Sequence, residues 1–311
     1  MYRITNSPRT SLLEGKRIIV TGCWYKPINH TFLDPVDKTP THDKIIIPSS
    51  FPYMEKMKMN IGTAIAAVLA WNGADVLMLS HNEDKLKDIK FDLLKQLSPS
   101  LHIEYAWVNL LDEKSVKSFV SNLPTDKPIY RVQSIWLWAG NYQLKNDNPY
   151  LPLEEMDVGL MEAEVTTVIR GSQIMMRELS PILKKQQESK IVFISSMSAI
   201  RGYALWSSHC MAKGALDRYA NAVMLDLYKD NIRVSTVRPW AVDTGMYDSR
   251  ETRDAVKNIS KEHDGLWKTD DEIALMPPSA VGQVVNTILT SPAHIAVVNM
   301  VSKTQFPHQW S

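Results

Sequence analysis

Side chains that can move protons cluster in the second half of the chain. His209 and Lys213 are four residues apart in a stretch whose pattern predicts a helix, so the two side chains are neighbours on one helix face. A nearby ammonium disfavours the imidazolium form, which keeps a histidine neutral and able to act as a general base. Ser196 ends an apolar strand thirteen residues before His209 and adds a hydroxyl. This grouping predicts acid–base chemistry.

The elements that must position these residues alternate between strands and helices. We expect strands at 17–21, 75–80, 102–108, 132–139, 190–195, 233–237 and 296–301, and helices at 61–70, 83–97, 112–123, 153–185, 206–228 and 280–289. Such alternation predicts right-handed crossovers and a parallel sheet with helices on both faces. The expected fold is therefore α/β, a doubly wound sheet in three layers, with residues 1–311 forming one domain.

Composition narrows the classes of function. The chain has 44% hydrophobic and 22% charged residues, which suits a globular protein with a full core. A net charge of +1 provides no overall attraction for nucleic acid or an anionic membrane, and no stretch reaches the ~18 apolar residues of a membrane span. We therefore expect a cytoplasmic protein with a small-molecule substrate, no nucleic-acid partner and no membrane partner. Cys23 and Cys210 match no metal spacing and are expected to be reduced, and no metal site is expected.

The segment from 190 to 216 resembles the active-site segment of the short-chain dehydrogenase/reductase superfamily. In that family a Ser closes a strand, and Tyr-x-x-x-Lys follows thirteen residues later. Here Ser196 and Lys213 match the pattern, but the Tyr position is His209. Gly171-Ser172-Gln173 resembles the family's Gly-Thr-Gln, and counting back from it places the relay Asn at Glu164. The resemblance thus implies a catalytic set of Glu164, Ser196, His209 and Lys213, in which Lys213 also binds the cofactor ribose.

The resemblance extends from about Leu13 to Gln305 and implies a Rossmann-type sheet of about seven strands, with cofactor and substrate meeting at the carboxyl ends of the strands. It also implies a homodimer or homotetramer formed through the helices at 153–185 and 206–228. The segment at 241–276 is expected to cover the substrate.

A long insertion interrupts the glycine turn that holds the cofactor phosphates in this family. The turn pattern is Thr-Gly-x-x-x-Gly-x-Gly, in which the glycines let backbone N–H groups approach the pyrophosphate. Thr21-Gly22 matches its start, and Asn60-Ile61-Gly62 matches its end with Asn in place of Gly. The 37 residues from Cys23 to Met59 stand between them.

The insertion has five prolines and no glycine, which favours an ordered loop. Either it arches away and lets the turn close, or it folds over the pyrophosphate site. It could serve oligomer contacts, cover the site or replace the cofactor. Its histidines and aspartates match no known metal spacing; these are His30, Asp34, Asp37, His42 and Asp43.

Other cofactor positions are also altered. No acidic residue that would select NAD ends the second strand, and His81 stands near the position where the family often has an Arg for the 2′-phosphate, so NADP is favoured over NAD. The resemblance further assigns cofactor contacts to Asn109, Ala139, Gly140, Pro239 and Thr244. Trp138 and Trp240 add bulk next to two of these positions.

Three functions are compatible with these residues. The first is a divergent NAD(P)-dependent oxidoreductase that acts on a carbonyl or alcohol of a small apolar substrate, with His209 in place of Tyr. The second is an enzyme of the same fold that performs isomerisation, elimination or ring closure in a pocket lined by Trp138, Trp206 and Trp240. The third is a non-catalytic binding or scaffold protein. The first is favoured because the family's turn, Ser and Lys are retained together, which the fold alone does not require.

Overall fold

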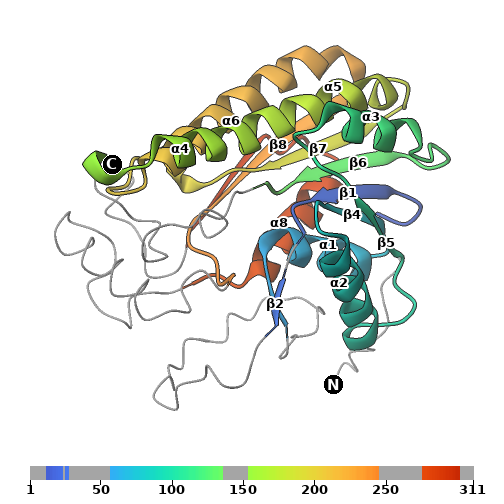
Figure 1. Ribbon diagram of the computed structural model, residues 1–311. Coiled ribbons are helices and arrows are strands. Elements are labelled where there is room, and N and C mark those ends of the chain that lie inside the picture. The colour runs from blue at the N-terminus through green and yellow to red at the C-terminus, as the bar shows by residue number, and fades with distance from the viewer. Residues whose placement is uncertain (1–11, 24, 28–56, 136–152, 245–274, 302–311) are drawn as a thin grey trace.

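Buried apolar strands form one seven-stranded parallel sheet in the computed structural model (Figure 1). The structure describes residues 12–23, 25–27, 57–135, 153–244 and 275–301. The sheet order is β5-β4-β1-β6-β7-β8-β9. Its strands are β1 (Arg17–Thr21), β4 (Asp75–Ser80), β5 (Ile103–Trp107), β6 (Ile129–Gln133), β7 (Ser189–Ile194), β8 (Ile232–Pro239) and β9 (Val297–Met300). Because all neighbours are parallel, the carboxyl ends of the strands share one edge.

Helices cover both faces of this sheet, which confirms the three-layer Rossmann-type fold (Figure 1). One face carries α1 (Ile61–Trp71), α2 (Glu83–Gln96) and α8 (Pro278–Thr290). The other carries α3 (Glu113–Ser121), α4 (Val158–Val165), α5 (Gly171–Leu183) and α6 (Ser207–Leu227). Strands between two helical layers are buried on both sides, and all six residues of β7 are buried accordingly. Within the described part of the chain, no helix combines the length and apolar character needed to cross a membrane.

The long helical stretch expected at 153–185 is confirmed over 158–183, but it is not one regular α-helix. The structure has a 3-10 turn at η4 (Leu153–Glu155), then α4, a π-helical turn at η5 (Thr166–Arg170), and α5. The π turn coincides with four consecutive β-branched residues, 166–169, which pack poorly against the preceding turn of an α-helix. A π turn changes the phase of the helix, so buried positions on its two sides do not follow one 3.6-residue pattern.

The strand expected at 132–139 is also misplaced. β6 begins at Ile129, ends at Gln133, and its five residues are buried although Arg131 and Gln133 are polar. Because these two residues are polar, the strand lacks the apolar pattern by which buried strands are predicted. The Arg131 guanidinium donates a hydrogen bond to the Gln133 side-chain oxygen, which satisfies part of their hydrogen-bonding capacity. The rest of that expected strand, from 136 onward, lies outside the described residues.

The insertion after β1 begins and ends as a two-stranded antiparallel ribbon, β2 (Tyr25–Pro27) with β3 (Met57–Met59). Met59 is buried in the main core, which ties the ribbon to the domain. Residues 28–56, with the five His and Asp positions named above, lie outside the described residues. The expected substrate-covering segment at 241–276 is described only at its ends, where Val242 and Met276 form a parallel bridge.

Candidate active site

A histidine–glutamate pair lies where α4 meets the first turn of α6. His209 Nδ1 is 2.8 Å from Glu164 Oε1, and the Ser208 hydroxyl donates to Glu164 Oε2 at 2.9 Å. The exposed fractions of the two side chains are 16% for His209 and 9% for Glu164. Two groups separated by 45 positions in sequence are thus joined in a largely buried contact.

The electrostatics of this pair settle which group carries the proton at neutral pH. Burial raises the pKa of Glu164, but hydrogen bonds from His209 and Ser208 outweigh burial and hold the pKa below its ordinary value. Burial lowers the pKa of His209, and the attraction of Glu164 offsets only part of that effect. The resting pair is therefore a carboxylate that accepts from a neutral imidazole, and His209 donates through Nδ1.

Lys213 lies one helical turn beyond His209 and is buried, with 4% of its surface exposed. Its ammonium donates to the backbone oxygens of Ile135 at 3.0 Å and Ile194 at 3.2 Å, which follow β6 and end β7. Burial lowers the pKa of Lys213 to about 8, against the attraction of Glu164 and Asp217. Lys213 therefore brings a positive charge to the carboxyl edge of the sheet at neutral pH.

Ser196 stands at the carboxyl end of β7, where it caps the short 3-10 helix η6 (Met197–Ala199). Its hydroxyl accepts from the Ser198 N–H at 3.1 Å and donates to the Ser198 hydroxyl at 3.1 Å. η6 packs against α6, so Ser196 and the start of α6 belong to one region of the fold. The expected set thus consists of a joined pair, Glu164 and His209, with Lys213 and Ser196 placed by the adjacent strand ends.

An aromatic group adjoins His209. The Trp206 ring meets the imidazole edge to face, with centroids 5.5 Å apart, and Tyr203 packs on Trp240 at 4.5 Å. Leu205, between Tyr203 and Trp206, adopts a left-handed φ of 63°, which is rare for a bulky residue. Burial raises the pKa of Tyr203, which makes its phenol a poor substitute for the missing Tyr. Trp138 lies outside the described residues.

The glycine turn closes despite the insertion. Gly22 has a φ of +75°, and a Cβ there would lie 1.7 Å from the backbone oxygen of Ser134. A Cβ on Gly62 would lie 2.5 Å from the Gly22 oxygen. Asn60 joins the two sides because its amide donates to that same oxygen at 2.7 Å and its side-chain oxygen caps α1 at the Thr63 N–H. Both glycines are therefore required by close backbone approach, and the N-terminus of α1 faces the strand edge as a phosphate site requires.

Replacing Asn60 with alanine should destabilise the fold by about 2 kcal/mol, because both an N-cap and a link across the turn are lost. The matched control is Asn82→Ala, which removes only the N-cap of α2 and should cost about 1 kcal/mol. Urea unfolding of both variants measures the difference. Equal losses would contradict the linking role of Asn60.

The remaining expected cofactor residues lie in different surroundings. The buried Thr21 hydroxyl accepts from the Ser134 N–H at 3.3 Å, and exposed His81 accepts at its backbone oxygen from the Trp107 indole at 2.9 Å. The Asn109 N–H donates to the Ser115 hydroxyl, and the Asn109 side-chain oxygen accepts from the Leu111 N–H; both bonds shape the turn after β5. Ile61 opens α1, and Pro239 ends β8, with Thr244 just beyond it. Ala139 and Gly140 lie outside the described residues.

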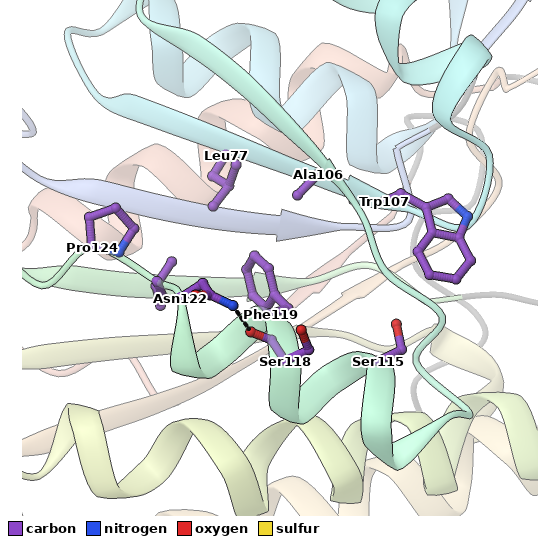
Figure 2. Close-up of a pocket in the computed structure, with 9 residues that line it drawn as sticks. Leu77, Ala106, Trp107, Ser115, Ser118, Phe119, Asn122 and Pro124 are labelled. Atoms are coloured by element: carbon purple, nitrogen blue, oxygen red, sulfur yellow. Dashed lines mark hydrogen bonds between the residues drawn. The ribbon is translucent and has the colours of Figure 1, made fainter.

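A separate cleft of about 400 Å³ lies between the β4–β5 part of the sheet and α3 (Figure 2). Leu77 and Ala106 form one side, and Ser118 and Phe119 of α3 with its C-cap residue Asn122 form the other. It shares no residue with the acid–base group. Its lining residues include no titratable side chain, so this cleft offers no group for acid–base chemistry.

Sequence reasoning missed Ser208 and the buried ion pair between Asp217 and Arg238, whose atoms are 2.6 Å apart. Asp217 follows Lys213 by one turn, so the spacing of acidic and basic residues along α6 was a usable signal. For Ser208 no such signal exists. Adjacent residues on a helix point in different directions. Ser208 and His209 both reach Glu164 only because α4 lies across the start of α6.

Comparison with known proteins gives the family context of this site. A family model described as short chain dehydrogenase matches residues 58–255. A tropinone reductase homologue from Arabidopsis thaliana is 23% identical over 190 residues, which cover 60% of this chain and 55% of that protein. The chain thus spans about half the length of that relative. The 3-oxoacyl-[acyl-carrier-protein] reductase of Bos taurus is 24% identical over 242 residues, covering 77% of this chain and 92% of that protein.

Among solved structures, an NADPH-bound short chain oxidoreductase from Pseudomonas aeruginosa PAO1 superposes with a TM-score of 0.65. The match covers 95% of this chain and 99% of that chain at 13% sequence identity. That protein is described as containing an atypical catalytic center. At this identity the likeness shows a shared fold.

Proposed function

Because the chain belongs to the short-chain dehydrogenase/reductase family, we propose that it is an NAD(P)-dependent oxidoreductase acting on a carbonyl or alcohol, with His209 in place of the family's Tyr. The observation that carries this proposal is the buried Glu164–His209 pair beside Lys213, at the strand edge where the glycine turn closes. A proton-transferring group and a phosphate-binding turn at one sheet edge are the two parts such a reaction requires.

The closed turn is compatible with a dinucleotide, since the lack of a Cβ at Gly22 and Gly62 lets the backbones approach closely and brings the N-terminus of α1 against the end of β1. In this proposal Gly22, Asn60, Ile61, Gly62 and the start of α1 hold the pyrophosphate. When bound, the nicotinamide would supply or accept the hydride. NADP is the form that we favour; His81 would hold its 2′-phosphate, and Lys213 would hold its ribose. The other proposed cofactor contacts are Thr21, Asn109, Ala139, Gly140, Pro239 and Thr244.

The chain's own contribution is proton transfer. In the oxidation direction, neutral His209 takes the proton of the substrate hydroxyl at Nε2, since Nδ1 is engaged by Glu164. Glu164 then stabilises the imidazolium that forms. In the reduction direction the imidazolium returns the proton to the carbonyl oxygen, which Ser196 polarises. Lys213 disfavours excess positive charge on His209, so the protonated state is short-lived at neutral pH.

The pH dependence follows from the direction of the His209 pKa, which lies below its ordinary value of 6.5. Oxidation needs the neutral imidazole, so kcat/KM for an alcohol should be constant between this pKa and neutral pH and fall as pH drops through it. Glu164→Gln removes the charge that raises the pKa, so the acid limb should move to lower pH. Initial rates of alcohol oxidation, measured between acid and neutral pH, locate the acid limb of the wild type and that of Glu164→Gln. A limb that stays fixed or moves upward in Glu164→Gln would contradict this assignment.

We further propose that the substrate is small and apolar, supported by the rings of Tyr203, Trp206 and Trp240 beside His209. The test is a panel of ketones, aldehydes and alcohols, with oxidation or reduction of the nicotinamide followed by absorbance. Turnover of apolar members with NADPH or NADP is the expected result. If the chain binds neither cofactor and turns over none of the panel, the proposal fails.

A second candidate is non-redox acid–base chemistry, such as isomerisation or elimination. The Glu164–His209 pair favours it because a neutral imidazole oriented by a carboxylate can abstract a proton without a hydride acceptor. The panel separates the two candidates. Substrate conversion that does not require a nicotinamide would support this second function.

We propose a homodimer or homotetramer in the cytoplasm that binds neither nucleic acid nor membrane. α6 exposes Met211 and Leu225 about four turns apart on one face, with exposed fractions of 44% and 74%. Leu225→Arg should therefore lower the mass measured by light scattering to that of a monomer. Phe91→Arg, which alters an apolar residue exposed on α2 across the sheet, is the control and should leave the mass unchanged. A monomeric wild-type protein would contradict the proposal.

A further inference from the structure

We infer that Ser208 is a positioning residue that fixes Glu164 and thereby sets which ring nitrogen of His209 carries the proton. This inference rests on the proposed role of His209 and adds a residue to it. The supporting geometry is a carboxylate held at both oxygens by adjacent residues of one helix turn. Ser208 donates to Oε2 at 2.9 Å, and His209 contacts Oε1 at 2.8 Å.

The backbone beside this carboxylate departs from regular α-helix. Glu164 is the penultimate residue of α4, and the π-helical turn η5 begins two residues later. A glutamate side chain has several rotatable bonds, so its carboxylate needs a partner to fix its orientation. The Ser208 hydroxyl holds one oxygen, so the other oxygen stays in line with Nδ1 of His209.

The helix also favours the charge that this arrangement needs. Ser208 and His209 are in the first turn of α6, and the N-cap residue, Trp206, makes no side-chain capping bond. The partial positive charge at a helix N-terminus stabilises an anion placed there. Among the described residues, the titratable groups that interact with the pair are Lys213, on the same helix, and Cys210, whose pKa the charge of Glu164 raises. Glu164 thus stays ionised, and a bond to an ionised acceptor keeps the proton of His209 on Nδ1.

As a consequence, the two imidazole nitrogens of His209 have different roles. A histidine with no partner mainly carries its proton on Nε2. Here the anchored carboxylate holds the proton on Nδ1 and assigns exchange with a substrate to Nε2. Without Ser208, Glu164 can rotate, the Nδ1 bond weakens, and the Nε2-protonated form, which cannot accept a substrate proton at that atom, becomes populated.

The test needs no substrate. Protein labelled with ¹⁵N at histidine reports the protonated nitrogen of each imidazole by NMR, and His209→Gln identifies the signal of His209. We expect the wild type to show the Nδ1-protonated form at neutral pH. Ser208→Ala should shift the ratio of the two forms by about tenfold toward Nε2, the effect of losing one hydrogen bond to a charged group. Ser208→Thr, which keeps the hydroxyl, should restore the wild-type ratio.

The matched control is Ser207→Ala in the same helix turn. The Ser207 hydroxyl contacts the Met156 sulfur rather than Glu164, so the His209 signal should not change. An unchanged tautomer ratio in Ser208→Ala overturns the inference, and so does an equal shift in Ser207→Ala. The proposed function has a separate failure, which is turnover that persists in His209→Gln. The two failures are distinguishable because the inference is tested by an NMR spectrum of the resting protein, whereas the proposed function is tested by a turnover rate.

Discussion

Replacing His209 with glutamine is expected to lower turnover by about 10²- to 10⁴-fold, the usual contribution of a positioned general acid–base group. Glutamine keeps a polar side chain of similar size and can still donate to Glu164, but it cannot exchange a proton at the reacting position. The loss should appear in kcat more than in KM, because the imidazole acts in the transition state. Steady-state rates on the substrates found by the panel measure the split.

Cys210→Ser is the matched control for His209→Gln. The thiol is adjacent in sequence and is close enough to feel the charge of Glu164, but it donates weakly to the backbone oxygen of Arg201 rather than to the carboxylate. Its replacement should leave kcat within about twofold, since surface and half-buried changes outside a site have small effects. If His209→Gln retains wild-type kcat while the fold is intact by circular dichroism, His209 is not the proton-transfer group.

Replacing Gly22 with alanine is expected to be among the most destabilising single changes available in this chain. The added Cβ would lie 1.7 Å from the backbone oxygen of Ser134, which no side-chain movement can relieve. The left-handed backbone adds strain of about 1–2 kcal/mol for a residue with a Cβ. We expect a loss of more than about 4 kcal/mol, measured by urea unfolding, or failure to fold.

Gly15→Ala separates these two causes. Gly15 has a similar φ of +72°, but a Cβ there would meet no atom within 4 Å. Gly15→Ala should therefore lower the free energy of unfolding by only about 1–2 kcal/mol, which is the cost of the backbone strain. If both variants lose the same stability, β1 and β6 do not approach closely at Gly22 and the closed turn is incorrect.

The layered fold could be predicted because it depends on periodicity. β1 and β7 are continuous apolar runs, and the amphipathic helices between strands repeat at 3.6 residues, so their order already implies a parallel sheet. The prediction was wrong where periodicity is hidden. β6 contains Arg131 and Gln133, which bond to each other inside the core, and the π turn at η5 changes the helical period between α4 and α5.

The positions of the candidate site residues could be predicted from the sequence, but the contacts between them could not. His209, Lys213 and Ser196 follow one fixed spacing, and Glu164 follows from a count along a helix, so sequence placed them on the same edge. The bidentate hold on Glu164 depends on where α4 crosses α6, and no local pattern encodes a crossing of two helices. The closure of the glycine turn across 37 inserted residues likewise depends on the antiparallel pairing of β2 with β3.

Cofactor binding is the most direct test of the account. Thermal unfolding should be measured without ligand, with NADPH and with NADH. We predict that NADPH at about 100 times its Kd stabilises the protein by about 2.7 kcal/mol and raises Tm by several degrees, with a smaller rise for NADH at the same concentration. An unchanged Tm with both nucleotides at millimolar concentration would contradict the assignment of this chain as an NAD(P)-dependent oxidoreductase.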